Sequence, residues 1–201
     1  MYADSIDNES IAQLPRLEFD GKIVIIRTEQ ELHQWIPKLL AEKIVGFDTE
    51  TKPSFKKGER NRIALLQLAT PSLALLIKMK QVGLPRILAE ILEDPKILKI
   101  GAAIRDDIKA LRKIAEFKPD GFIDLQQVVP TYGIENLSVR KMAAIVLNGK
   151  VSKSQQLSNW DNENYSEAQQ QYAAIDAWVC REIYLKLIST RTENELSPNI
   201  P

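Results

Sequence analysis

The stretch IVGFDTE, residues 44–50, decides the fold, because it has the character of a strand that ends in two acids. Its first residues are mostly apolar or β-branched, as in strands buried within a sheet. Asp48 and Glu50 are two positions apart, so their side chains point to the same face of the strand. Val45 and Phe47 occupy the opposite face. The stretch therefore predicts a largely buried strand that carries two neighbouring carboxylates.

Strands and helices are predicted on both sides of this stretch. Other strands are expected at 21–28, 63–70, 73–77, 97–101 and 122–124, the second and third of these forming a hairpin through Pro71 and Ser72. Helices are expected at 28–41, 85–93, 105–115, 126–132 and 138–146, and from Ser166 to about Ser189. A hairpin-rich group of strands followed by alternating strands and helices predicts an α/β fold, with a mixed sheet flanked by helices.

A length of 201 residues fits one domain with short extensions. Residues 1–20 show no clear hydrophobic period and contain Pro15, so they are interpreted as an N-terminal arm that packs on the core. The domain is expected to span residues 21–190, and residues 191–201 form a C-terminal tail. Polar stretches at 51–61 and 148–164 are the two main candidate loops.

Charge and composition limit the classes of function. The chain has 27 basic and 27 acidic residues, which argues against a protein that coats nucleic acid through bulk charge. It leaves open an enzyme that holds a few nucleotides in a local cleft. No apolar run approaches the roughly 20 residues that span a bilayer, and the N-terminus lacks the features of a signal peptide. A single cysteine, Cys180, suits a reducing compartment. We therefore expect a cytoplasmic protein without a membrane partner.

Two ionised carboxylates on one face of a buried strand repel each other and are costly to remove from water. A hard divalent cation offsets that cost, because Mg²⁺ and Mn²⁺ prefer carboxylate oxygens. Taken alone, however, Asp48 and Glu50 are better explained as acids at a strand end that reach solvent. The pair indicates a metal site only if other acids lie close to it in the fold.

Two predicted helices supply candidates for such a convergence. Tyr172 and Asp176 are four residues apart and share a helix face, and the alanines around them allow close approach to a sheet. In the helix expected at 105–115, Asp107 borders the apolar face, whereas Asp106 points outward. Each of these signals alone has an ordinary structural explanation, as a tyrosine at the edge of the core or a solvated aspartate.

In combination the motifs are more specific. FDTET (47–51), GAAIRDDIKAL (101–111) and YAAID (172–176), in this order, resemble the three exonuclease motifs of the ribonuclease D family. Within that family, the likeness is nearest to the exonuclease domain of the Werner syndrome helicase. IALLQLAT (63–70), KPSF (52–55) and QLSNW (156–160) are subsidiary matches, and the resemblance covers nearly the whole chain.

The resemblance implies a ribonuclease H-like fold and a metal-dependent 3′→5′ exonuclease. Asp48, Glu50, Asp107 and Asp176 match the metal ligands of the family, and Tyr172 matches its catalytic tyrosine. Two divalent cations, Mg²⁺ or Mn²⁺, would activate a water and stabilise the leaving 3′ oxygen, releasing nucleoside 5′-monophosphates. The partner would be a nucleic acid with a free 3′ end. Neither the choice between DNA and RNA nor the oligomeric state follows from these motifs.

Contacts to the substrate are predicted mainly around the loop after the first two acids. A cation-rich loop with an aromatic residue can grip phosphates and stack on a base, although a solvated loop explains it equally well. The candidates are Thr49, Thr51, Lys52, Phe55, Lys56, Lys57, Arg60 and Lys153, the last of which would act with Lys150 as a second phosphate contact near the cleft. Structural roles are expected instead for Gln67 and Asp124 as hydrogen-bonding residues and for Trp160 as a packing anchor. His33, the only histidine, is expected to be a surface or half-buried residue.

Two other classes of function remain open at this point. The first is a catalytically weak nucleic-acid-binding module on the same fold. The second is a phosphatase of the haloacid dehalogenase type, suggested by the acidic strand end. That family uses D-x-D, whereas position 50 here is Glu. Activity on a polynucleotide separates the exonuclease from both.

Overall fold

The computed structural model describes residues 2–51 and 62–196. The strands are β1 (Lys22–Ile26), β2 (Ile44–Thr51), β3 (Ile63–Ala69), β4 (Leu73–Lys78), β5 (Leu98–Gly101) and β6 (Phe122–Asp124). The helices are α1 (Asn8–Gln13), α2 (Glu29–Leu39), α3 (Met79–Val82), α4 (Arg86–Glu93), α5 (Arg105–Leu111), α6 (Leu125–Val128), the 3-10 helix η1 (Val129–Tyr132), α7 (Val139–Leu147) and α8 (Glu167–Leu196).

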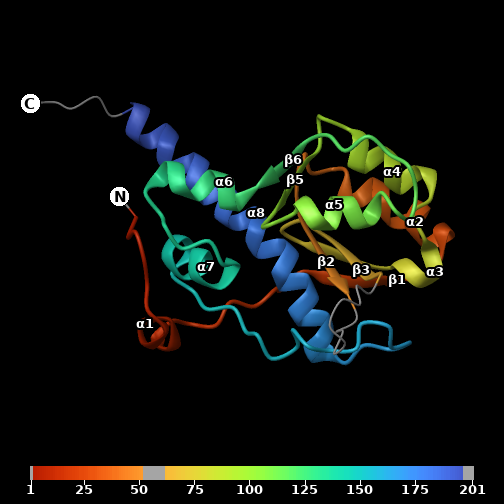
Figure 1. Cartoon of the computed structure of the whole chain (residues 1–201), viewed down its shortest axis with the longest axis horizontal. Coiled ribbons are helices and arrows are strands. Elements are labelled where there is room, and N and C mark those ends of the chain that lie inside the picture. The colour runs from red at the N-terminus through yellow and green to blue at the C-terminus, as the bar shows by residue number, and fades with distance from the viewer. Residues whose placement is uncertain (1, 52–61, 197–201) are drawn as a thin grey trace, which may run out of the picture.

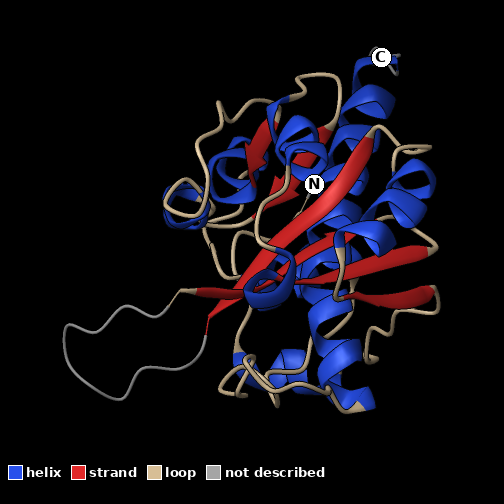
Figure 2. Ribbon diagram, turned by 90° about the vertical axis from the view of Figure 1, so that its right-hand side faces the viewer, coloured by secondary structure: helices blue, strands red, loops and turns tan. Residues whose placement is uncertain are grey.

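The strands form one mixed sheet in the order β1-β4-β3-β2-β5-β6. β3 is antiparallel to both of its neighbours, β2 and β4, whereas the pairs β1–β4, β2–β5 and β5–β6 are parallel. Helices cover both faces, with α8 crossing the sheet diagonally on one side and α2, α4 and α5 on the other (Figures 1 and 2). The predicted α/β fold with a flanked mixed sheet is confirmed.

The two faces of β2 have different partners, as its sequence pattern predicts. Val45 and Phe47 are fully buried in the apolar cluster formed with α2, α4 and α5. Asp48 and Glu50 point to the other face, toward α8. No helix in the described part of the chain is long and apolar enough to cross a membrane.

Several element boundaries differ from the sequence-based expectations. The capping box of α2 is present, with Thr28 accepting from the Glu31 backbone and Glu31 reaching back. The last helix begins with the expected reciprocal bonds between Ser166 and Gln169 but continues past Ser189 to Leu196. α5 ends earlier than expected, at Leu111. The short helices α1 and α3 were not predicted, because one or two turns are too brief to show a hydrophobic period.

α8 lies unusually close to β2 because Gly46 has no side chain. A Cβ atom added at Gly46 would come within 1.8 Å of the backbone carbonyl oxygen of Ala177, a distance that no real contact allows. The small side chains of Ala173, Ala174 and Ala177 are buried in the same interface. This contact sets the distance between the helix and the strand that ends in Asp48 and Glu50.

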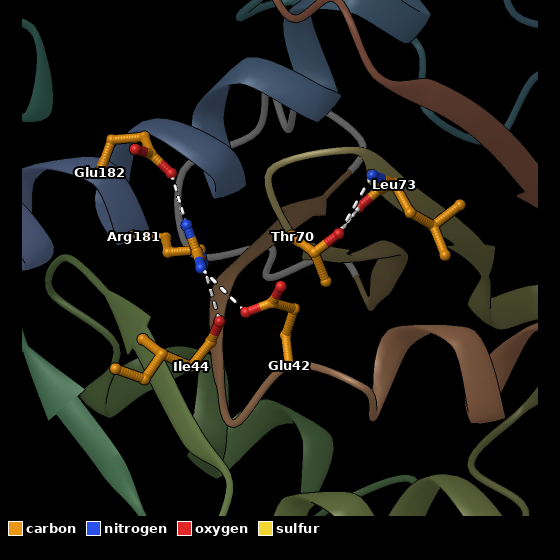
Figure 3. A network of polar contacts seen from close by, with 6 residues as sticks. All are labelled: Glu42, Ile44, Thr70, Leu73, Arg181 and Glu182. Carbon is orange, nitrogen blue, oxygen red and sulfur yellow. Dashed lines mark hydrogen bonds and ion pairs between the residues drawn. The ribbon is translucent and has the colours of Figure 1, made fainter.

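A buried arginine fixes α8 at the start of β2 (Figure 3). The Nε atom of Arg181 donates to the Ile44 carbonyl oxygen at 2.8 Å, and its guanidinium forms ion pairs with Glu42 and Glu182 at 3.2 and 2.7 Å. The Arg181 side chain is only 7% exposed, so these partners satisfy a charge that would otherwise be costly to bury. In the same view, Thr70 bonds to the Leu73 backbone and closes the β3–β4 hairpin.

We predict that Gly46→Ala destabilises the protein by about 1–3 kcal/mol, because the methyl group has to displace the backbone of α8 and cores respond to overpacking with costs of this size. Urea unfolding followed by circular dichroism measures the change. A midpoint equal to that of the wild type would show that α8 does not rest on β2 at this residue.

Candidate active site

Three carboxylates from two elements meet at the end of β2. Asp48 and Glu50 come from the strand and Asp176 from α8, and one oxygen of each lies within 4.8 Å of the others. All three residues are partly buried. The packing of α8 at Gly46 produces this convergence, since Asp48 follows Gly46 by two residues on the same face of the strand.

The fourth predicted acid, Asp107, faces the same region from α5. Its carboxylate accepts a hydrogen bond from the hydroxyl of Thr49 on β2, and its charge raises the pKa of both Asp48 and Glu50. It lies outside the group of three carboxylates whose oxygens are within 4.8 Å. Its neighbour Asp106 points outward with a 75% exposed side chain and pairs with Lys109. Helix periodicity thus separated the two aspartates correctly.

The turn before α5 also approaches β2 closely. A Cβ atom at Gly101 would lie 2.8 Å from the carbonyl oxygen of Phe47. Ala103 adopts a left-handed conformation, with φ of 57°, and its N–H donates to Asp124 at 3.0 Å. Asp124 also caps α6, which confirms its predicted structural role. These contacts position the first turn of α5, and with it Asp107, beside Thr49.

All four acids have raised pKa values, and the charges of neighbouring acids add to the effect of burial at Asp48 and Glu50. Partial burial is the largest cause throughout, and it raises the pKa of Glu50 to about 8 and that of Asp176 to about 7. The pKa of Asp48 is well above its ordinary value, because burial is reinforced by the charges of Asp176, Glu50 and Asp107. Burial likewise raises the pKa of Asp107. The cluster is thus an unfavourable concentration of negative charge.

Tyr172 joins the cluster from one turn earlier on α8. Its hydroxyl is hydrogen-bonded to Asp176, and its ring stacks on the buried Trp160 with a centroid distance of 5.9 Å. Burial and the nearby carboxylates raise the pKa of Tyr172 above its ordinary value. The tyrosine is therefore a protonated donor at neutral pH. Trp160, fully buried and in edge contact with Tyr165, is the packing anchor that was predicted.

Gln67 differs from its prediction. It is fully buried on β3 directly opposite Asp48, but neither atom of its amide has a hydrogen-bond partner among the described residues. The expected structural hydrogen bond is therefore not made. In an antiparallel pair, directly opposed side chains share a face. No local pattern in the sequence predicts this, because the pairing of β3 with β2 determines which side chain lies beside Asp48.

The predicted substrate contacts have different outcomes. Lys153 lines a cavity of about 220 Å³ that also contains Asp48, Tyr172 and Asp176. Thr49 contacts Asp107, and Thr51 is exposed at the end of β2. Lys52, Phe55, Lys56, Lys57 and Arg60 lie outside the described residues. His33 is a surface residue, as predicted, and lies 3.8 Å from Glu29.

Sequence reasoning missed other residues that line this cavity. They are Ser138, Val139 and Arg140 from the start of α7, together with Val151, Ser152 and Gln156. Gln156 opens the QLSNW stretch, which was noted only as a subsidiary motif. The capping position of Ser138 was recognisable, but its proximity to the acids depends on how α7 packs against α8.

The chemistry of the cluster fits divalent metal ions. The donors are carboxylate oxygens, which hard cations such as Mg²⁺ and Mn²⁺ prefer. Within the described residues, Asp48, Glu50, Asp107 and Asp176 form no ion pair with a cationic side chain. Cations bound here would remove that repulsion. If these side chains formed only a network of neutral hydrogen bonds, a carboxylate would not be required at each of the four positions.

Comparison with known proteins decides the family. Residues 23–190 match the family model described as 3′-5′ exonuclease. The chain belongs to the 3′-5′ exonuclease family. The match covers β1 to most of α8 and so includes every acid of the site.

Relatives of this exonuclease domain agree with the assignment. The mouse bifunctional 3′-5′ exonuclease/ATP-dependent helicase WRN is 33% identical over 184 residues, covering 87% of this chain. The mouse exonuclease 3′-5′ domain-containing protein 2 is 32% identical over 184 residues, covering 84% of this chain. The chain spans only 13% of the length of WRN and 28% of the length of this second relative.

Solved structures support the fold and the use of metal. The Aedes aegypti Nibbler EXO domain matches with a TM-score of 0.79 at 23% identity, over 89% of this chain and 94% of that one. The EXD2 exonuclease domain soaked in Mn matches with a TM-score of 0.51 at 30% identity, over 90% of this chain and 99% of that one. The ribonuclease H-like fold is confirmed, and the crystal of the related EXD2 exonuclease domain was soaked in Mn.

We predict that, in metal-free buffer, Glu50→Gln becomes more stable relative to the wild type as the pH rises from 5 to 8. A carboxylate whose pKa is raised on folding contributes stability below its unfolded pKa and loses it as the pH passes its folded pKa, here about 8 for Glu50. Glutamine does not titrate. Urea unfolding of both proteins at the two pH values measures the difference, and a change of opposite sign would contradict the electrostatic description of the site.

Proposed function

We propose that this domain removes nucleotides one at a time from the 3′ end of a nucleic acid, using two divalent cations, Mg²⁺ or Mn²⁺. The observation that carries the proposal is the convergence of Asp48, Glu50 and Asp176 within 4.8 Å, with Tyr172 bonded to Asp176. Membership of the exonuclease family supports the reaction type, and the Mn-soaked EXD2 domain supports the choice of cation.

The chain's own residues would divide the work as follows. Asp48, Glu50 and Asp176 would hold the cations, with Asp107 completing the set from α5. Bound divalent cations lower the pKa of a water and stabilise charge on the phosphoryl group and the leaving oxygen. Thr49, which donates to Asp107, would keep that carboxylate turned toward β2.

Tyr172 is assigned to positioning and not to proton abstraction. Its raised pKa keeps the hydroxyl protonated, and the single hydroxyl proton is donated to Asp176. With cations held by Asp176, the same proton could be donated to a water or to a phosphate oxygen at the site. Stacking on Trp160 fixes the ring, and the bond to Asp176 fixes the hydroxyl. The products would be nucleoside 5′-monophosphates. A cytoplasmic location and the division into arm, domain and tail remain predictions.

We predict that Asp48→Asn and Asp176→Asn abolish nuclease activity, because each removes a cation ligand. Tyr172→Phe should lower kcat by about 10²-fold, the cost of losing one positioned donor. A 3′-extended oligonucleotide labelled at its 5′ end, digested with Mn²⁺, shows shortening from the 3′ end. Asp106→Asn is the matched control, since it neutralises a neighbouring, exposed aspartate and should leave the rate unchanged.

Excess chelator should stop the reaction of the wild type. Cleavage that persists in chelator, or in Asp48→Asn, would exclude the proposed chemistry. Oligonucleotide binding without any cleavage by the wild type would favour the alternative, a nucleic-acid-binding module.

A further inference from the structure

A second cavity adjoins the acidic site. Its volume is about 470 Å³, and it is lined by Arg16, Arg140, Lys150, Val151, Ser152 and Lys153. The cavity of the acidic site shares four of these residues, Arg140, Val151, Ser152 and Lys153. The two cavities are therefore parts of one groove, which runs from the carboxylates to a cationic end. We call this end the basic groove and define it by Arg16, Arg140, Lys150 and Lys153.

Charge in the basic groove is of one sign. Its lining contains four cationic side chains and no carboxylate among the described residues, in a chain whose basic and acidic residues are equal in number. Within the described part of the protein, none of the four forms an ion pair. Arg140 donates to the Asn8 amide oxygen at 3.1 Å and Lys150 to the Ala12 carbonyl oxygen, and both partners are neutral. The positive charge thus remains uncompensated.

The N-terminal arm holds this groove in place. Arg16 and Lys150 form an isolated parallel bridge, with backbone bonds from Leu17 to Lys150 and from Lys150 to Pro15 of 3.0 and 2.8 Å. Ile11 of α1 is fully buried. The arm runs beside α7 before it enters β1 (Figure 1). Backbone contacts on both sides of Arg16 therefore fix the position of its Cα atom at the groove.

We propose that the basic groove binds the sugar–phosphate backbone of a single nucleic-acid strand, upstream of the nucleotide whose bond is cut. Arg140 and Lys153, which border both cavities, would contact the phosphates nearest the acids, and Arg16 and Lys150 those further along the strand. This inference rests on the proposed function, because the acids define where the 3′ end lies.

A single strand fits the groove better than a duplex does. The cavity has the volume of a small-molecule site, roughly 300–1,000 Å³, which suits a few nucleotides of one strand. Guanidinium and ammonium groups along a groove form contacts with phosphates that do not depend on sequence. Trp160 and Tyr165 are buried and do not line the groove, so they cannot stack on bases there. Binding in the groove would therefore depend on the cationic side chains.

Binding of a fluorescent single-stranded oligonucleotide, followed by anisotropy at several salt concentrations, tests the proposal. The Asp48→Asn background prevents degradation. Adding Arg16→Ala and Arg140→Ala should weaken binding about tenfold and reduce the salt slope by about 1.4, since each single-strand phosphate contact contributes about 0.7. Arg16→Lys with Arg140→Lys should restore most of the affinity, because the charge is kept. Lys113→Ala with Lys96→Ala is the control for cations outside the groove.

Unchanged affinity and slope in the double alanine variant would overturn the proposal, as would equal binding of a blunt duplex with the same dependence on Arg16 and Arg140. If the double variant unfolds, Arg16→Ala alone decides, since Arg16 is exposed. Failure of the proposed function is recognised separately. In that case the wild type does not shorten the oligonucleotide in Mn²⁺, whatever the binding data show.

Discussion

The contact between α8 and β2 at Gly46 is the constraint on which the site depends. A backbone carbonyl of α8 occupies the space of a missing Cβ atom, so the backbones of the helix and the strand are in direct contact. One turn of α8 places Ala177 against Gly46 and Asp176 against Asp48. Arg181 extends the same contact by one further turn, where it binds the Ile44 carbonyl oxygen (Figure 3). A wider separation would leave the carboxylates too far apart to share cations.

This close packing has an electrostatic cost. It buries acids whose pKa values are thereby raised, and the charges of the other three acids raise the pKa of Asp48 further. The buried amide of Gln67, opposite Asp48 and without a hydrogen-bond partner in the described residues, is a further unfavourable polar group beside the acids. Proteins place such unfavourable groups at functional sites, where a ligand compensates for them. The clustered acids lower the stability of the fold, and a bound cation would offset this cost.

The sequence predicted the site well where local geometry decides the outcome. The two-residue period of a strand placed Asp48 and Glu50 together, and the four-residue spacing of a helix placed Tyr172 beside Asp176. Periodicity also distinguished Asp107 from Asp106. Strands and most helices followed from apolar patterns and capping residues such as Thr28. Their convergence in space followed only from the resemblance, because no local pattern specifies which elements meet.

Features that depend on tertiary packing were not predictable. The unpartnered state of Gln67 follows from strand pairing, and the basic groove from an arm whose Arg16 is far from Arg140 in sequence. Helix α1 is too short to show a period, although Asp7 caps it. The end of α8 was misplaced because its polar last turns carry no apolar pattern that predicts where the helix stops.

The central claim is that carboxylates from β2 and α8 form one cation site. Anomalous diffraction from crystals soaked in Mn²⁺ tests it most directly. The account predicts a strong anomalous peak bound by oxygens of Asp48, Glu50 and Asp176, which is lost in Asp176→Asn crystals. An ordered cluster without any anomalous peak at saturating Mn²⁺, or a peak bound by other residues alone, would contradict it.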